Sequence, residues 1–221
     1  MVEVTKMIIT LLKEKNYMDV MSEFEDGTVT KKKVSAKELA YSLSAATTNE
    51  YIHIGRMPKG YYDSRIDATG KDCFDIVLTT DAGIYPVQYL NEPPKLIPFP
   101  KLAFRFSFMN GQLKDSLCFA LKTGSPVLYH YPFGNVYSDG KICWGGHSFD
   151  GITKLHHSEQ VARKFYELAT NDDLWSSTYV HGHAPVLSAV YNELAGMETF
   201  PEGWLFPASG EGTIDELLLK K

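Results

Sequence analysis

Cys143 is the residue of this chain with the clearest potential for covalent chemistry. It follows a polar turn at residues 137–140, and Asn135 lies eight residues before it. A thiolate nucleophile needs an exposed sulfur and a donor aimed at the oxygen that becomes negative during acyl transfer, and this loop offers both. The alternative is that Cys143 is a small core residue beside an ordinary Asp-Gly turn, with Asn135 bonded to its own backbone.

Histidines elsewhere in the chain are candidate partners for this thiol. His147 lies four residues after Cys143, and His181 and His183 follow later in the sequence. Positive charge near a thiol lowers its pKa and favours the thiolate. A cysteine peptidase or acyltransferase would pair Cys143 with His181 or His183. The alternative for each histidine is a solvated surface position.

Bound metals and nucleotides are not indicated. The chain contains the donor types of a zinc site, but no Cys-x-x-Cys or His-Glu-x-x-His pattern fixes two ligands on one element. A glycine-rich phosphate loop is also lacking in the sequence. We therefore expect no cofactor, and no ATP-dependent activation by this chain alone.

The elements that would position these residues are mostly strands. Turn signals at residues 26–27 and 110–111 each separate two apolar or alternating segments, which predicts two hairpins, and residues 81–83 separate two further predicted strands. In the last hairpin, Phe104, Phe106 and Phe108 alternate with smaller or polar residues and form a buried face. The predicted strands are 17–24, 28–34, 51–55, 74–80, 84–90, 102–109 and 113–122, with a proline-rich extended connector over residues 93–100.

Helices are predicted on both sides of these strands. Ser35 opens a capping box for a helix over residues 35–46, and Ser158 is a candidate cap for a helix over 159–169. Further helices are predicted over 185–194 and 214–219, and residues 3–15 suit either a helix or a helix start that feeds a strand. The order indicates an α+β fold with an antiparallel sheet.

Composition limits the classes of partner. The chain has 221 residues and a net charge of −5, which argues against a broad nucleic-acid surface. Its three cysteines and the lack of a secretory leader indicate a reducing cytoplasm. The longest apolar run near the start is too short to span a membrane, so we expect no membrane insertion.

The pattern Asn-x-x-x-Asp-Gly-x-Ile-Cys, at residues 135–143, resembles the active-site flap of ubiquitin-conjugating enzymes. The chain departs from that pattern at Phe133-Gly134, where the family has His-Pro, which puts the support of the flap in doubt. The segments PVLYHYPFGNVYSDGKICWG and LWSSTYVHGH are similar to the prokaryotic conjugating-enzyme-like family of PRTRC system protein B. The resemblance covers most of the chain from about residue 50 onward and is strongest around Cys143.

This resemblance implies a fold, a reaction and partners. The fold would be an antiparallel β-meander flanked by helices, with residues 1–34 as an N-terminal extension and 35–221 as the conjugating-like domain. Cys143 would accept a ubiquitin-like protein from a ThiF-like activating enzyme and pass it to an amine, with Asn135 as the oxyanion donor. Asp173 (or Asp172) and His181 match residues that assist the amine. A JAB-type peptidase would be a further neighbour, and a non-catalytic adaptor is the alternative.

Overall fold

The protein, described here by a computed structural model, divides into two compact units, residues 1–53 and 54–221. The structure describes residues 4–11, 17–35, 37, 56–67, 72–180, 186–208 and 212–219. The domain boundary predicted between residues 34 and 35 falls inside the first unit. The predicted strand over 51–55 and nearly all of the predicted helix over 35–46 lie outside the described residues.

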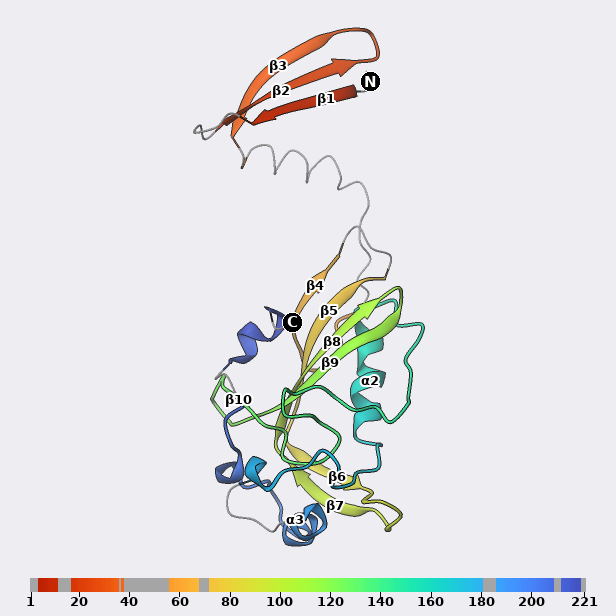
Figure 1. The fold of residues 1–221 in the computed structure, drawn as a ribbon, viewed down its shortest axis with the longest axis vertical. Coiled ribbons are helices and arrows are strands. Elements are labelled where there is room, and N and C mark those ends of the chain that lie inside the picture. Colours follow the sequence, from red (N-terminus) through yellow and green to blue (C-terminus); the bar gives the residue numbers. More distant parts are fainter. Residues whose placement is uncertain are drawn as a thin grey trace. The chain divides into compact units, whose positions relative to one another are not determined.

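The first unit contains a three-stranded antiparallel sheet in the order β1-β2-β3 (Figure 1). Its strands are β1 (Val4–Leu11), β2 (Tyr17–Phe24) and β3 (Val29–Ser35). The helix considered over residues 3–15 is wrong, because β1 pairs along its length with β2. The predicted hairpin around Gly27 is confirmed, and Gly27 has the positive φ of +76° that this turn requires.

The second unit is built on a five-stranded antiparallel sheet in the order β10-β9-β8-β5-β4. The strands are β4 (Tyr61–Ile66), β5 (Phe74–Thr80), β8 (Lys101–Met109), β9 (Gln112–Leu121) and β10 (Leu128–Tyr129). The predicted hairpin around Asn110-Gly111 is confirmed as β8 and β9. Strand β4 was not predicted, because it is an edge strand with exposed polar residues such as Asp63 and Arg65.

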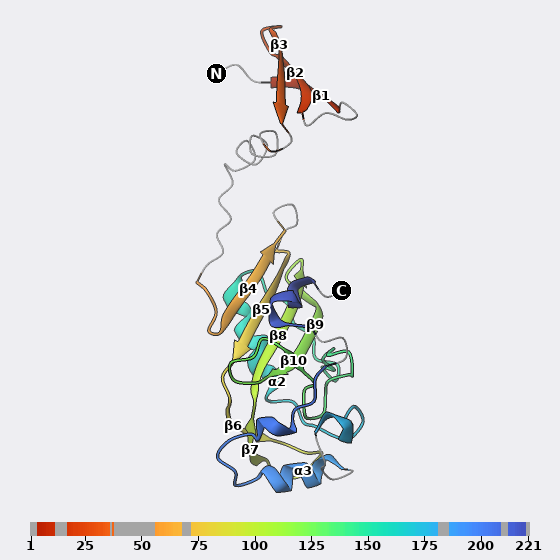
Figure 2. The same cartoon turned by 90° about the vertical axis from the view of Figure 1, so that its left-hand side faces the viewer.

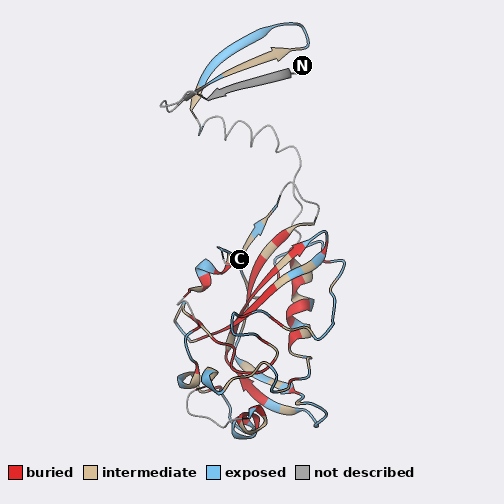
Figure 3. Cartoon of the chain, viewed as in Figure 1, coloured by how far each residue is buried: buried red, intermediate tan, exposed pale blue. Residues whose placement is uncertain are grey.

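Side chains alternate between the two faces of this sheet, and each face has its own core. One face carries Phe104, Phe106 and Cys118 and packs against the helix α2 (Ser158–Phe165). The other face carries Val77, Ala103 and Phe119 and packs against the 3₁₀ helix η4 (Ile214–Leu219). Figure 2 shows α2 and η4 on opposite sides of the sheet, and Figure 3 shows that burial is concentrated in its central strands. The fold is therefore α+β with an antiparallel sheet.

A two-stranded ribbon, β6 (Gly83–Val87) and β7 (Lys95–Phe99), lies between β5 and β8 in the sequence. The proline-rich connector predicted over residues 93–100 is therefore partly a strand. Its Pro98 lies opposite Ile84. Proline is tolerated there because both strands of a two-stranded ribbon are edges, which leaves one side without ladder hydrogen bonds.

The remaining helices follow the sheet. The helix α3 (Leu187–Leu194) occupies most of the predicted helix over 185–194, and the short 3₁₀ helices are η1 (Leu155–His157), η2 (Ser177–Tyr179) and η3 (Glu202–Trp204). The segment predicted as a helix over 214–219 is the 3₁₀ helix η4. Ser158 is not the cap of α2: it is the first residue of the helix, and its hydroxyl donates to the Leu155 carbonyl at 2.5 Å.

Candidate active site

The loop that carries Cys143 folds back on itself through main-chain hydrogen bonds. The Cys143 N–H donates to the Asn135 carbonyl at 2.8 Å, and Val136 pairs with Ile142. At the tip, the Gly140 N–H donates to the Tyr137 carbonyl at 2.9 Å. This closed loop fixes Asn135 and Cys143 side by side at its two ends.

The same loop lies along the edge of β9. The Ile142 N–H donates to the Ser116 carbonyl at 3.1 Å, and the Cys118 N–H donates to the Gly140 carbonyl at 2.8 Å. Gly140 has a φ of +89°, and a Cβ at this position would lie 2.3 Å from an atom of the Phe119 ring. The glycine is therefore needed both for the backbone conformation and for the close approach to β9.

Cys143 opens onto a pocket of about 390 Å³. Its thiol is free and half-buried. The pocket wall also includes Asn135, His147 and Asp173, which are separated by as many as 38 positions in the sequence (173 − 135 = 38). The structure therefore brings together four of the residues that the sequence singled out. His181 and His183 lie outside the described residues.

Asn135 joins the two walls of this pocket. It has a φ of +67°, and its Nδ2 donates to the Ala169 carbonyl at 2.9 Å. The amide is thus bonded to the segment after α2 rather than to its own turn. Because a side-chain amide has two N–H groups, this bond leaves a second donor on Nδ2. The neighbouring Gly134 is equally constrained, since a Cβ there would lie 2.6 Å from the Asn171 carbonyl oxygen.

The two candidate aspartates differ in their surroundings. Both carboxylate oxygens of Asp172 accept hydrogen bonds within the fold. Oδ1 accepts from the Leu187 N–H at 2.9 Å, and Oδ2 accepts from the Tyr89 hydroxyl at 2.5 Å. The bond to Asp172 raises the pKa of Tyr89. Asp173 is exposed, lines the pocket and accepts from Asn171 Nδ2 at 2.8 Å. Of the two, Asp173 is the one available to a ligand.

A tight turn leads from Cys143 to His147. The His147 N–H donates to the Trp144 carbonyl at 3.0 Å, and the two central residues, Gly145 and Gly146, have φ values of +58° and +88°. Two successive positive φ values are typical of a type I′ turn, which favours glycine at both positions. His147 is exposed at the end of this turn.

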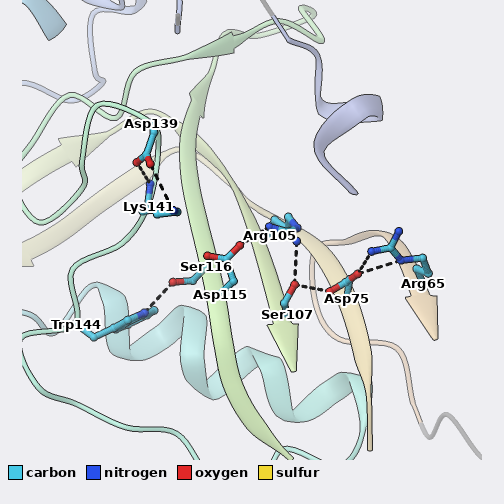
Figure 4. Close-up of polar contacts among 9 residues, drawn as sticks. All are labelled: Arg65, Asp75, Arg105, Ser107, Asp115, Ser116, Asp139, Lys141 and Trp144. Carbon is cyan, nitrogen blue, oxygen red and sulfur yellow. Dashed lines mark hydrogen bonds and ion pairs between the residues drawn. The ribbon is translucent and has the colours of Figure 1, made fainter. Parts of the chain in front are cut away.

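Trp144 is a site residue whose position the sequence did not reveal. Its Nε1 donates to Ser116 Oγ on β9 at 2.9 Å, as Figure 4 shows, and its ring contacts Phe149 edge-on at 4.8 Å between centroids. The residue lines the pocket beside Cys143. Its only signal in the sequence was its position directly after the cysteine.

The other cysteines differ from Cys143. Cys118 is fully buried, and burial raises the pKa of its thiol well above the ordinary value. Cys73 is half-buried and does not line the pocket. Among the residues that the structure describes, no group of three or more His, Cys, Asp or Glu side chains is arranged to hold a metal ion.

Comparisons with family profiles, curated proteins and solved structures find no match to this chain. In the described parts of the chain, no helix has the length and hydropathy needed to cross a bilayer.

Proposed function

We propose that this protein is a conjugating enzyme that carries a ubiquitin-like protein as a thioester on Cys143 and transfers it to an amine. The observation that carries the proposal is the convergence of Cys143, Asn135, His147 and Asp173 on one open pocket. A cysteine that served only for packing, as Cys118 does, would be buried away from such a cavity.

The order of elements supports the resemblance to ubiquitin-conjugating enzymes. The family order is a helix, an antiparallel meander, a cysteine loop and then further helices. The described residues contain the last three in that order, and the predicted first helix lies outside them. The position where the family has a buttressing histidine holds Phe133, which is fully buried and contacts Phe99 at 4.8 Å between ring centroids. Aromatic packing therefore provides the support of the loop that the missing histidine put in doubt.

In the first step, the Cys143 thiolate adds to the carbonyl carbon of a donor thioester, and the donor sulfur leaves as a thiolate. Negative charge develops on the carbonyl oxygen during this step. The second N–H of the Asn135 amide is the donor that would stabilise this oxyanion, and the loss of one such donor typically costs about 10²–10³ in rate. The Ala169 bond holds that amide in a fixed orientation.

In the second step, a neutral amine attacks the Cys143 thioester and releases the thiolate. The attacking nitrogen loses a proton as the new amide forms, so a nearby acceptor for the proton accelerates the step. Asp173 is exposed and lines the same pocket as Cys143, and its carboxylate would orient and deprotonate the amine.

Two alternative functions make different demands on the site. A peptidase needs a histidine bonded to the nucleophile. The histidines that such a peptidase would use, His181 and His183, lie outside the described residues, whereas His147 lines the same pocket as Cys143. Transthiolation needs no such base, because one thiolate replaces another. A non-catalytic adaptor would bind the ubiquitin-like protein without forming a covalent adduct.

The test is the intact mass of the protein after incubation with a ThiF-like activating enzyme and a ubiquitin-like protein encoded beside it, ATP and magnesium. We expect an adduct that a thiol reductant removes and that Cys143→Ala abolishes, while Cys73→Ala retains it. If the activating enzyme becomes charged and no adduct forms on this protein, the proposal is wrong and the adaptor is favoured. A JAB-type peptidase in the same cytoplasmic system remains a proposed partner.

A further inference from the structure

Asn171 lines the Cys143 pocket and precedes Asp173 by two positions in the sequence. Its side chain bonds to Asp173 at two places. The Asn171 Nδ2 donates to the Asp173 Oδ2 at 2.8 Å, and the Asn171 Oδ1 accepts from the Asp173 N–H at 3.1 Å. One amide group therefore holds both the main chain and the carboxylate of Asp173.

The main chain of Asn171 is packed against the cysteine loop. A Cβ at Gly134 would lie 2.6 Å from the Asn171 carbonyl oxygen and 3.6 Å from the Asn171 nitrogen. Gly134 precedes Asn135, whose carbonyl accepts from the Cys143 N–H at 2.8 Å. Asn171 thus connects the loop that carries the nucleophile with the carboxylate that we propose for the amine step.

The residues on both sides of Asn171 are also fixed. The Thr170 N–H donates to the Gln88 carbonyl at 2.8 Å, and the Leu90 N–H donates to the Thr170 carbonyl at 2.8 Å. The carboxylate of Asp172 accepts from an N–H in the first turn of α3 at 2.9 Å. The main chain at residue 171 therefore has little freedom, and a side chain attached to it can hold a neighbouring group in one orientation.

The Asp173 side chain is exposed. An exposed carboxylate samples several rotamers unless a neighbour holds it, and a catalytic group is most effective when it is already placed for the reaction. A carboxylate accepts at two oxygens, so the bond to Oδ2 does not occupy Oδ1. The bond from Asn171 therefore restricts the carboxylate and still allows it to accept a proton.

We infer that Asn171 is a positioning residue, which acts on the amine step by holding the Asp173 carboxylate in place. This inference rests on the proposed function and adds the residue on which the proton acceptor depends. In the step itself, the amine nitrogen forms a bond to the thioester carbon and the carbon–sulfur bond breaks. The Cys143 sulfur leaves as a thiolate, and the proton of the amine passes to Asp173. Asn171 takes part only through Asp173.

The assay separates the two steps of the reaction. Cys143 is first acylated with the mercaptoethanesulfonate thioester of acetylglycine, and the excess donor is removed. Free lysine is then added over a range of concentrations, and intact mass follows the loss of the acyl group from Cys143, with the loss in buffer alone subtracted. This gives a kcat and a KM for the amine step. The rate of the first acylation is recorded for every variant.

Asn171→Asp is the decisive variant, because the new carboxylate keeps an oxygen that accepts from the Asp173 N–H and lacks the Nδ2 donor. We expect the kcat of the amine step to fall about tenfold, as the loss of one hydrogen bond to a charged group implies, and the first acylation to be unchanged. Asn192→Asp is the matched control. It adds the same charge at an exposed position of α3 outside the pocket, and we expect it to match the wild type in both steps.

A double-variant comparison tests whether Asn171 acts through Asp173. Asn171→Ala alone should slow the amine step about tenfold, and in the Asp173→Asn background it should slow this step no further. A residue that only stabilised the pocket wall would slow both backgrounds and the first acylation as well. A residue that bound lysine directly would raise the KM in both backgrounds.

Three results would overturn the inference and leave the thioester carrier intact. They are wild-type rates in Asn171→Asp, equal losses from Asn171→Ala in the two backgrounds, and an amine step that does not depend on Asp173. If Cys143 is not acylated, or if the wild-type protein does not pass the acyl group to lysine, the proposed function fails, and the inference fails with it.

Discussion

Replacing Gly140 by alanine tests how firmly the cysteine loop is held against β9. Gly140 has a φ of +89°, and a Cβ there would lie 2.3 Å from the Phe119 ring, which is buried. The Gly140 carbonyl also accepts from the Cys118 N–H at 2.8 Å. The loop therefore cannot move away from the ring without losing a main-chain bond to the sheet.

The expected cost has two parts. An alanine in the left-handed region costs about 1–2 kcal/mol, and the overlap with a packed ring costs about 1–3 kcal/mol. The sum is about 2–5 kcal/mol for Gly140→Ala. Gly124 is the matched control: its φ is +73°, but a Cβ there would have no atom within 4 Å. Gly124→Ala should therefore cost only the first part.

The assay is urea unfolding followed by tryptophan fluorescence, because Trp144, Trp175 and Trp204 all belong to the second unit. Gly140→Ala should lose about 1–3 kcal/mol more than Gly124→Ala, and Phe119→Leu should recover part of that excess in the double variant. Acylation of Cys143 should slow only in Gly140→Ala. If both glycine variants lose the same stability and react at the same rate, the close contact with Phe119 does not hold the loop.

Three further predictions concern single residues. At pH 8, iodoacetamide should label Cys143 in the folded protein and leave Cys118 unlabelled, because burial raises the pKa of Cys118 and keeps it a thiol; peptide mapping after labelling checks this. Asp173→Asn should slow transfer from the Cys143 thioester to free lysine by about 10²-fold with little loss of stability, whereas Asp172→Asn should cost about 0.5–2 kcal/mol because Asp172 accepts from the first turn of α3. Burial lowers the pKa of His130, so the unfolded state binds the proton more tightly and stability should fall as the pH drops below about 6.5; the urea midpoint at pH 7.5 and 5.5 should differ more in the wild type than in His130→Gln.

The cysteine loop could be predicted from the sequence because its signals are local. The Asp139-Gly140 turn, the positive φ at Gly140 and the short return to Cys143 all lie within nine residues. The β8–β9 hairpin has the same advantage, since Asn110 and Gly111 both have positive φ at the turn. In such segments the chain itself determines which residues face each other.

Other elements could not be predicted because their stability comes from distant partners. Strand β4 has polar residues at positions where an edge strand meets solvent, so its sequence lacks an alternating apolar pattern. Strand β7 contains a proline that a central strand would exclude. Ser158 has the residue type of a cap, yet its hydroxyl bonds to the Leu155 carbonyl within the preceding 3₁₀ turn.

The walls of the Cys143 pocket meet through main-chain atoms, and this explains why the sequence identified the pocket residues but not its shape. The Asn135 amide reaches the Ala169 carbonyl, and Gly134 lies against the Asn171 carbonyl. Every residue has such a carbonyl, so no residue type in the segment after α2 indicates these contacts. The sequence does contain the residues that these contacts need. Gly134 stands where a side chain would not fit, and Asn135 tolerates a φ of +67° while its amide donates across the pocket. Residues 134 and 135 therefore hold the cysteine loop against the segment that carries Asp173.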